Sequence, residues 1–178
     1  MSVQINGNGT ITGISVGGLP DGIVDTDMIA SNAVTPAKST IVGGKILQVV
    51  SANTTTQVQY TDTSFTATNL TVNITPTSAS SKIFVTSQFH LYKSGTSADA
   101  KVTLYRDSTN LGNATYGFGQ FSDLGGAGGG NSIVQTFDSP NTTSQVTYTV
   151  YVKMNSGHNV YVCSNNVAAN ITAMEYST

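Results

Sequence analysis

The chain has 178 residues, and 7 Lys and Arg against 9 Asp and Glu leave a net charge of −2, with only 9% of residues charged. A protein that binds nucleic acid through its phosphates needs clustered Lys and Arg side chains. Arg106 is the only arginine, so we expect no nucleic-acid partner. Glu175 is the only glutamate and Leu is scarce, so residues that favour helices are few. The composition predicts an all-β protein.

The sequence lacks the signals of a membrane or secreted protein. Its longest apolar run has four residues, 160–163, whereas a membrane-spanning helix needs roughly 20. Residues 1–9 carry neither the basic start nor the apolar stretch of a secretory signal, so we expect synthesis in a cytoplasm and no membrane partner. The single cysteine, Cys163, lies in an alternating segment, which predicts a buried thiol.

The composition changes after residue 42. Residues 1–42 are rich in glycine, contain three Asp before their first cation, Lys38, and show no lasting periodicity. Short alternations, such as Val3 with Ile5, suit extended segments that lie on the surface of another molecule. We therefore predict an extended N-terminal arm over residues 1–42 and a folded head over residues 43–178.

From residue 45 onward, short alternating runs are separated by turn residues. The expected strands cover residues 45–50, 58–61, 65–75, 83–92, 100–106, 111–118, 133–138, 146–154, 159–163 and 170–176. Both faces of the strand 83–92 carry aromatic side chains, so both are expected to be covered. Many short strands joined by turns predict an antiparallel β-sandwich that resembles a jelly roll.

Candidate sites for enzymatic or metal chemistry are few. His90 and His158 are the only histidines, and with one cysteine they form no recognisable zinc spacing. The acidic residues Asp21, Asp25 and Asp27 lack the glycine and the closing glutamate of an EF-hand loop. We therefore predict no catalytic residue, no metal site and no cofactor.

Two further features have simple structural interpretations. The glycine tract 125–130 lacks the Lys-Ser/Thr ending of a phosphate loop, and we predict a surface loop there. A hydrolase of glycans would carry a pair of carboxylates, and the only glutamate, Glu175, lies close to the C-terminal end of the sequence. An enzyme is therefore the weakest of the functional hypotheses.

Aromatic residues near the expected loops offer a candidate ligand site. Tyr92, Tyr116, Phe118 and Phe121 lie on or near loops, where aromatic rings are the usual platforms for sugars. The possible ligand-contact loop consists of Tyr116, Phe118 and Phe121. The alternative is that such residues pack at sheet edges or subunit contacts. The sequence leaves both interpretations open.

Several segments together resemble proteins on the surface of tailed bacteriophages. The quoted segments are ITPTSASSKIFV from Ile74, TLYRDSTNLG from Thr103, DSPNTTSQVTYTVYV from Asp138 and NITAMEY from Asn170. They are similar to a C-terminal domain of phage fibre and virion-surface proteins. The segment IVDTDMIASNAVTPAKS from Ile23 resembles arm or shaft segments of tail fibres.

The resemblance implies a structural protein on the virion surface, made in the bacterial host, with a head that is a homotrimer. Tail fibres reach outward on a shaft of many repeats, and this chain has about two imperfect ones. The favoured hypothesis is therefore a capsid-decorating or cement protein whose arm contacts the major capsid protein. The arm residues expected to make this contact are Val3, Ile5, Ile11, Ile14, Val16, Ile23 and Ile29. The alternative is a short tail fibre or receptor-binding protein, attached to tail components, that recognises a glycan on the host surface.

Overall fold

The computed structural model describes residues 4–5, 11–12, 45–95, 99–122, 126–155 and 158–177. The chain divides into two units, Met1–Val42 and Gly43–Thr178. In the first unit, β1 (Gln4–Ile5) pairs with β2 (Ile11–Thr12) in an antiparallel ladder. Most of the predicted arm lies outside the described residues.

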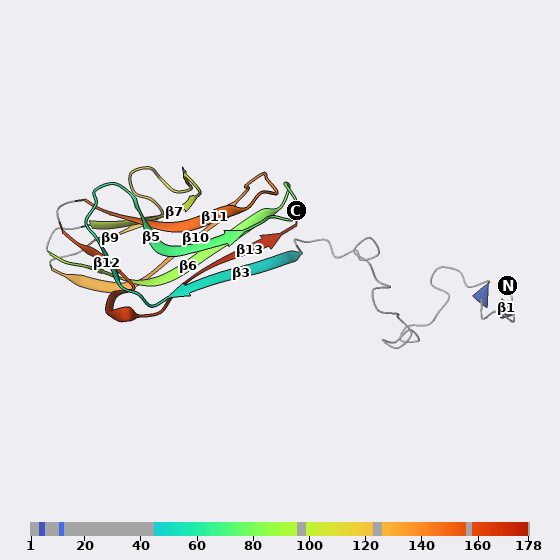
Figure 1. Cartoon of the computed structure of the whole chain (residues 1–178), viewed down its shortest axis with the longest axis horizontal. Helices are drawn as coiled ribbons and strands as arrows, with labels where there is room; N and C mark the ends of the chain where they lie inside the picture. The colour runs from blue at the N-terminus through green and yellow to red at the C-terminus, as the bar shows by residue number, and fades with distance from the viewer. Residues whose placement is uncertain are drawn as a thin grey trace. The chain divides into compact units, whose positions relative to one another are not determined.

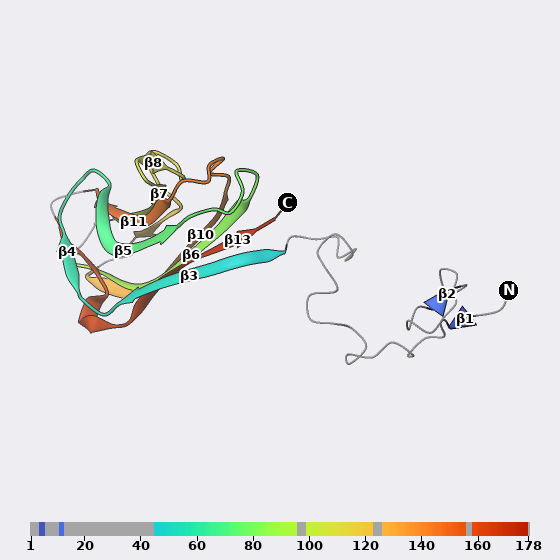
Figure 2. The same cartoon turned by 45° about the vertical axis from the view of Figure 1, so that its right-hand side comes forward.

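The second unit is a sandwich of two antiparallel sheets, which Figure 2 shows as two layers. The strands of the first sheet are β3 (Ile46–Thr54), β4 (Val58–Tyr60), β6 (Lys82–Lys93), β10 (Gly128–Asp138), β12 (Val160–Val162) and β13 (Ala169–Tyr176). The long strand β6 pairs with β10 along one edge, and with β13 and then β12 along the other. Because β3 pairs with β13 and β4 pairs with β12, these four segments form two interrupted strands.

The second sheet packs against the first and contains five strands. Its strands are β5 (Thr66–Ile74), β7 (Asp99–Arg106), β8 (Thr109–Asn110), β9 (Gly119–Ser122) and β11 (Val146–Met154). The central strand β11 pairs with β5 and β7, and the far edge of β7 pairs with both β8 and β9.

The order of the strands is that of a jelly roll. Three pairs of segments each occupy a single position in their sheet: β3 with β4, β12 with β13, and β8 with β9. Counted in this way, each sheet has four positions and the sandwich has eight. In chain order the first, eighth, third and sixth positions form one sheet, and the second, seventh, fourth and fifth form the other. This interleaved order of two four-stranded sheets defines the jelly roll. The predicted all-β, jelly-roll-like sandwich is therefore confirmed.

Alternating side chains fill the space between the sheets. In β11 each of Val146, Tyr148, Val150, Val152 and Met154 is buried, and the residues between them are only partly buried. In β6 the inward face carries Ile83, Val85, Phe89 and Leu91, all at most 1% exposed. The period of two in the sequence thus places one face of β5, β6, β11 and β13 in a common core.

A buried carboxylate fixes the turn that leads into β6. Glu175 on β13 is completely buried. Its Oε1 accepts hydrogen bonds from the backbone N–H and the hydroxyl of Thr77, both at 2.7 Å, and its Oε2 accepts one from Gln48. Burial alone would raise the pKa of Glu175. The neighbouring Ser81 hydroxyl and these hydrogen bonds together outweigh burial and lower the pKa to about 2. The only glutamate is therefore a structural anion.

A second polar cluster links the two sheets at one end of the sandwich. Both carboxylate oxygens of Asp138, at the end of β10, lie 2.8 Å from Nη1 of Arg106 on β7. The hydroxyl of Tyr148 on β11, which is fully buried, donates a 2.7 Å hydrogen bond to Oδ2 of Asp138. Burial and this hydrogen bond to a carboxylate raise the pKa of Tyr148. The cluster ties β10 of one sheet to two strands of the other.

Two local predictions are wrong. The expected strand over residues 111–118 is a turn closed by mutual backbone hydrogen bonds between Asn113 and Gly117. Gly117 has a φ of 65°, and a Cβ there would lie 2.2 Å from the carbonyl oxygen of Val102, which explains the glycine. The expected glycine loop is also partly wrong, because residues 128–130 begin β10 and pair with β6.

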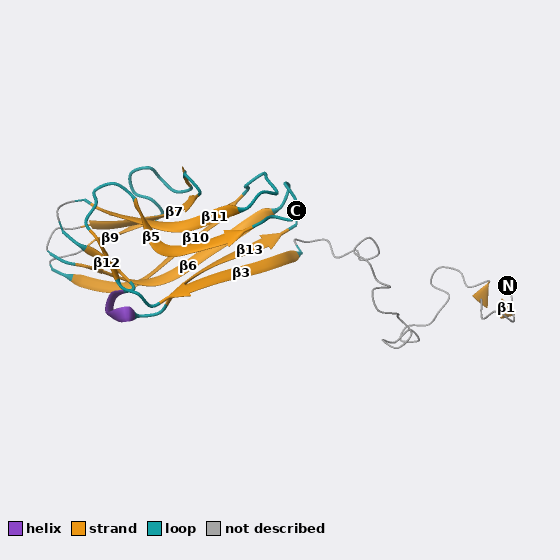
Figure 3. Ribbon diagram, in the orientation of Figure 1, coloured by secondary structure: helices purple, strands orange, loops and turns teal. Residues whose placement is uncertain are grey.

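The described residues contain one short helical turn (Figure 3). It covers Ser164–Asn166 as a 3-10 turn between β12 and β13. The residue before it, Cys163, is buried and has a free thiol, as predicted. Burial raises the pKa of this thiol.

Candidate functional site

A row of apolar side chains crosses the outer face of the first sheet. Val49, Met174, Phe84 and Phe137 are successive Cα partners across β3, β13, β6 and β10. Partners opposite each other in an antiparallel sheet point to the same face. Phe84 alternates with the core residues Ile83 and Val85, so the row faces away from the core. Apolar side chains therefore lie on both faces of this part of the sheet, and no described residue covers the outer face.

Aromatic contacts extend this row toward the end of the sheet at which β3 begins. The ring of Phe137 lies 4.8 Å from that of Phe84 and 6.1 Å from that of Tyr176, edge to face with the latter. Despite these contacts Phe137 is 70% exposed, and Val49 and Ile46 are 53% and 59% exposed. We call the six residues Ile46, Val49, Phe84, Phe137, Met174 and Tyr176 the apolar patch. Contiguous apolar surface of this kind marks interaction sites in soluble proteins.

The patch adjoins an unprotected sheet edge. β3 lies at the end of the first sheet, and among the described strands only β13 pairs with it. Its sequence ILQVVSANT contains neither a charged residue nor a proline, which are common protections of an edge strand. Leu47 on this strand is also 38% exposed. The edge and the patch together form one largely apolar surface suited to association, with Lys82, the Cα partner of Tyr176, at its margin.

The patch lies at the end of the head where its described residues begin and end. Lys45, the first described residue of the head, is hydrogen-bonded to Ser177 through both its backbone N–H and its carbonyl. Tyr176 and Ile46 pair directly beside this contact. Figure 1 shows the start of β3 and the C-terminus at the same end of the sandwich. Lys45 and Ser177 therefore lie beside the apolar patch.

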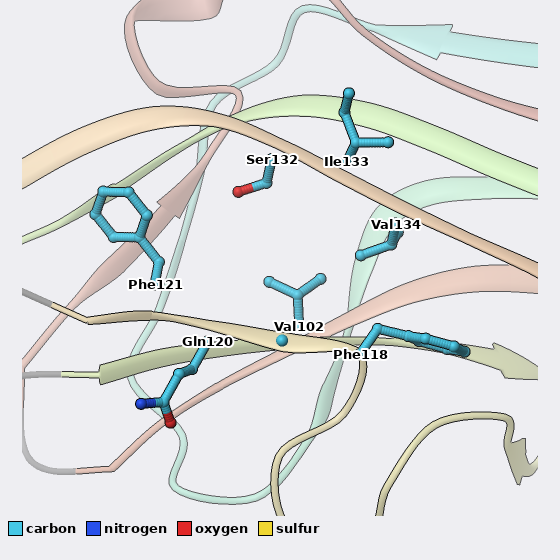
Figure 4. Close-up of a pocket in the computed structure, with 8 residues that line it drawn as sticks. Val102, Phe118, Gln120, Phe121, Ser132, Ile133 and Val134 are labelled. Carbon is cyan, nitrogen blue, oxygen red and sulfur yellow. The ribbon is translucent and has the colours of Figure 1, made fainter.

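The predicted ligand-contact residues are only partly brought together. Phe118 and Phe121 line a cavity of about 150 Å³ between β9 and β10. Ser132 and Val134 project into it from β10, and Val102 does so from β7 (Figure 4). Sites for small molecules usually have about 300–1,000 Å³, so this cavity is too small for a sugar. It is better explained as a gap between the edges of the two sheets.

The third residue of the predicted ligand site lies elsewhere. Tyr116 does not line the cavity and is 57% exposed. The Lys101 ammonium lies 5.0 Å from the centre of its ring, a cation–π arrangement. The three aromatic residues thus do not form a common platform.

The other predicted contacts can be placed only in part. Ile5 and Ile11 are Cα partners in the ladder of β1 and β2. The remaining expected arm contacts, Val3, Ile14, Val16, Ile23 and Ile29, lie outside the described residues. So do the acidic residues 21, 25 and 27.

Within the described part of the chain, no group of three His, Cys, Asp or Glu side chains could hold a metal ion. A search of those same residues finds no helix long and apolar enough to span a bilayer.

The sequence contained a signal for the apolar patch. Aromatic residues on both faces of the strand 83–92 predict that both faces are covered, yet no described residue covers the outer one. The pairing of Phe84 with Phe137 and Met174 was not predictable, because it depends on the register of three strands. Comparison with known proteins adds no assignment: no family model matches the chain, and no curated protein sequence does.

Proposed function

We propose that this chain is a structural protein of a tailed-bacteriophage virion that decorates the capsid. In this proposal residues 1–42 attach it to the major capsid protein, and the head associates as a homotrimer above the shell. The observation that carries the proposal is the exposed apolar patch beside Lys45, the first described residue of the head. The resemblance of several segments to phage surface proteins supports a structural role on the virion, which decoration proteins and tail fibres share.

The chemistry of the patch favours contact with a second copy of the chain. Cores of permanent protein interfaces are apolar, rich in aromatic residues and Met, and poor in charge. The patch contains three aromatic rings and a methionine, and its members include no charged side chain. Each square ångström of apolar surface removed from water contributes roughly 25 cal/mol. Burial between heads would therefore stabilise a trimer and cover the free edge of β3.

Cyclic symmetry connects the head and the arm. Three heads related by one axis place their equivalent ends on the same side of the assembly. The three Lys45 residues would then lie at one end, and three arms would leave from there toward the shell. Linked attachment points bind more tightly than separate ones, because the second contact becomes intramolecular. A weak contact by each arm would thus suffice for stable decoration.

Removal of the arm tests the attachment. We expect the full chain to sediment with purified capsids that lack it, and a variant without residues 1–38 to remain in the supernatant. Circular dichroism and thermal unfolding of the variant check that its head is still folded. Binding of a folded variant at the level of the full chain would overturn the proposal.

The same assay separates the capsid from the tail. Tailless capsids and isolated tails are incubated with the full chain in parallel. The proposal predicts binding to capsids. Binding to tails alone would favour a short tail fibre instead.

A further inference from the structure

At the end of the head opposite the apolar patch, two tyrosines line an open hollow. Tyr92 on β6 and Tyr161 on β12 are Cα partners on the outer face of the first sheet, with ring centres 5.8 Å apart. The hollow has a volume of about 520 Å³ and is lined by Gln57, Tyr92, Ser94, Tyr161, Ser164 and Asn165. This volume lies within the usual range for small-molecule sites, about 300–1,000 Å³.

The hollow combines apolar faces with uncharged hydrogen-bonding groups. Beside the two half-buried rings lie hydroxyl and amide groups, and no lining residue is charged. On the far side of Tyr92 the partner strand carries Gly129, so no side chain on that strand stands beside the tyrosine. Stacking surfaces with neutral donors and acceptors suit a ligand that has apolar C–H faces and many hydroxyls. A phosphate or a carboxylated sugar would instead require a cation.

Hydrogen bonds between Gln57 and the turn Ser164–Asn166 hold the rim of the hollow in place. Oε1 of Gln57 accepts a 2.7 Å hydrogen bond from the backbone N–H of Asn165, and Asn166 Oδ1 accepts one from the N–H of Gln57. Cys163, Asn165 and Asn166 all have positive φ, between 56° and 59°. Non-glycine residues in this region cost free energy and often cluster at functional sites. The rim is thus a pre-formed turn.

Two amide groups at this rim remain available. Among the described residues, the Nε2 of Gln57 and the side-chain amide of Asn165 make no hydrogen bond. The hydroxyl of Tyr92 likewise has no partner there, whereas that of Tyr161 accepts a 3.4 Å bond from Asn159. Polar groups that converge on a stacking surface fix the orientation of a ligand.

We infer that this hollow binds a neutral saccharide, with one sugar ring against Tyr92 and Tyr161 and its hydroxyls bonded to Gln57 and Asn165. The site does not overlap the predicted ligand loop around Tyr116. Tyr92 lies eight residues along β6 from Phe84, or about 26 Å at 3.3 Å per residue. Figure 1 shows β12 at the end of the sandwich opposite the C-terminus. A saccharide would therefore bind far from the patch and from Lys45.

Saturation-transfer NMR on the full chain tests the inference. The probes are glucose, galactose, mannose and N-acetylglucosamine at about 10 mM, above the millimolar Kd expected of a shallow site. At least one should receive saturation, and N-acetylneuraminic acid, which is anionic, should not. Failure of all four neutral sugars, or binding of the anionic sugar alone, would overturn the inference.

Three variants locate the site. Tyr161→Ala removes a stacking ring and should weaken binding at least tenfold. Gln57→Glu keeps the oxygen that accepts from Asn165 but removes the free amide donor. Asn165→Gly keeps the left-handed backbone but removes the side-chain amide. Each of these two variants should weaken binding about threefold without unfolding the head. The matched control is Tyr116→Ala, an exposed tyrosine outside the hollow, which should change nothing. Binding that survives all three variants, or is lost with Tyr116→Ala, would contradict the assignment.

Discussion

Glu175 on the last strand receives two hydrogen bonds from Thr77, one from its backbone N–H and one from its hydroxyl, each 2.7 Å long. Ninety-eight residues separate the two along the chain. The contact joins the strand β13 to the turn between β5 and β6, and thereby the two sheets. A buried anion with this many donors makes stability depend on pH.

The first prediction concerns this pH dependence. The folded pKa of Glu175, about 2, lies below the unfolded value of about 4.3. Its contribution is therefore complete above about pH 5 and is lost as the pH falls toward 2. Glu175→Gln should lower the free energy of unfolding at pH 7 by about 2 kcal/mol, and the difference should shrink at pH 3. Urea unfolding at pH 7, 5 and 3 measures it, with Asp62→Asn, at an exposed residue, as control. A difference that does not vary with pH would be inconsistent with this role.

The second prediction concerns the cluster that links the sheets. Tyr148→Phe removes the hydroxyl that donates to Asp138 in the core. A hydrogen bond to a charged group contributes about 1.5–3 kcal/mol, and we expect a loss of stability in this range. Tyr151→Phe is the matched control on the same strand, because its hydroxyl makes no hydrogen bond among the described residues, and it should change stability by less than about 0.5 kcal/mol. Chemical denaturation compares them, and equal losses would rule out a special role for the Tyr148 hydroxyl.

The third prediction concerns Gly117, in the turn before β9, and Gly119, the first residue of β9. An added Cβ at Gly117 would meet a carbonyl oxygen of β7 at 2.2 Å, and its φ of 65° adds strain, whereas a Cβ at Gly119 meets nothing within 4 Å. Gly117→Ala should therefore lower stability by about 1–3 kcal/mol. Gly119→Ala should change it by less than about 0.5 kcal/mol. Thermal unfolding checks both, and an equal effect at both positions would contradict the geometry of this turn.

The fourth prediction concerns the apolar patch. Phe137 is 70% exposed, so Phe137→Ser should leave the folded head intact. If the patch lies between heads, the change should weaken self-association at least tenfold, as for a residue at the centre of an interface. Light scattering on a dilution series should give three times the chain mass of 18.5 kDa for the unmodified protein and less for the variant. Val167→Ser, at an exposed residue outside the patch, is the control. A monomer at every concentration would exclude the trimer.

Much of the head was predictable because its long strands are amphipathic. The alternation of Val146, Tyr148, Val150, Val152 and Met154 identified β11 and its buried face. The expected strand over residues 111–118 failed because Gly112 and Gly117 permit a tight turn where alternation alone suggests extension. The expected loop at Gly128–Gly130 was wrong for the opposite reason. These residues form a strand because pairing with β6 overrides the weak strand preference of glycine.

The surfaces were less predictable than the core. Tyr92 and Tyr161 are far apart in the sequence, and only the pairing of β6 with β12 brings their rings together. Glu175 stands out in the sequence only as the single glutamate. Two of its hydrogen bonds come from Thr77, in a turn almost a hundred residues earlier, and a third comes from Gln48 on β3. Such contacts arise from register and topology, which hydrophobic periodicity does not specify.

Imaging of intact virions tests the proposed decoration of a phage capsid most directly. Electron cryo-microscopy should show the jelly-roll head as a three-fold cluster on the facets of the capsid, with density for the arm running into the shell beneath it. Density for the head on the tail alone, or single heads with no three-fold contact, would contradict the proposal.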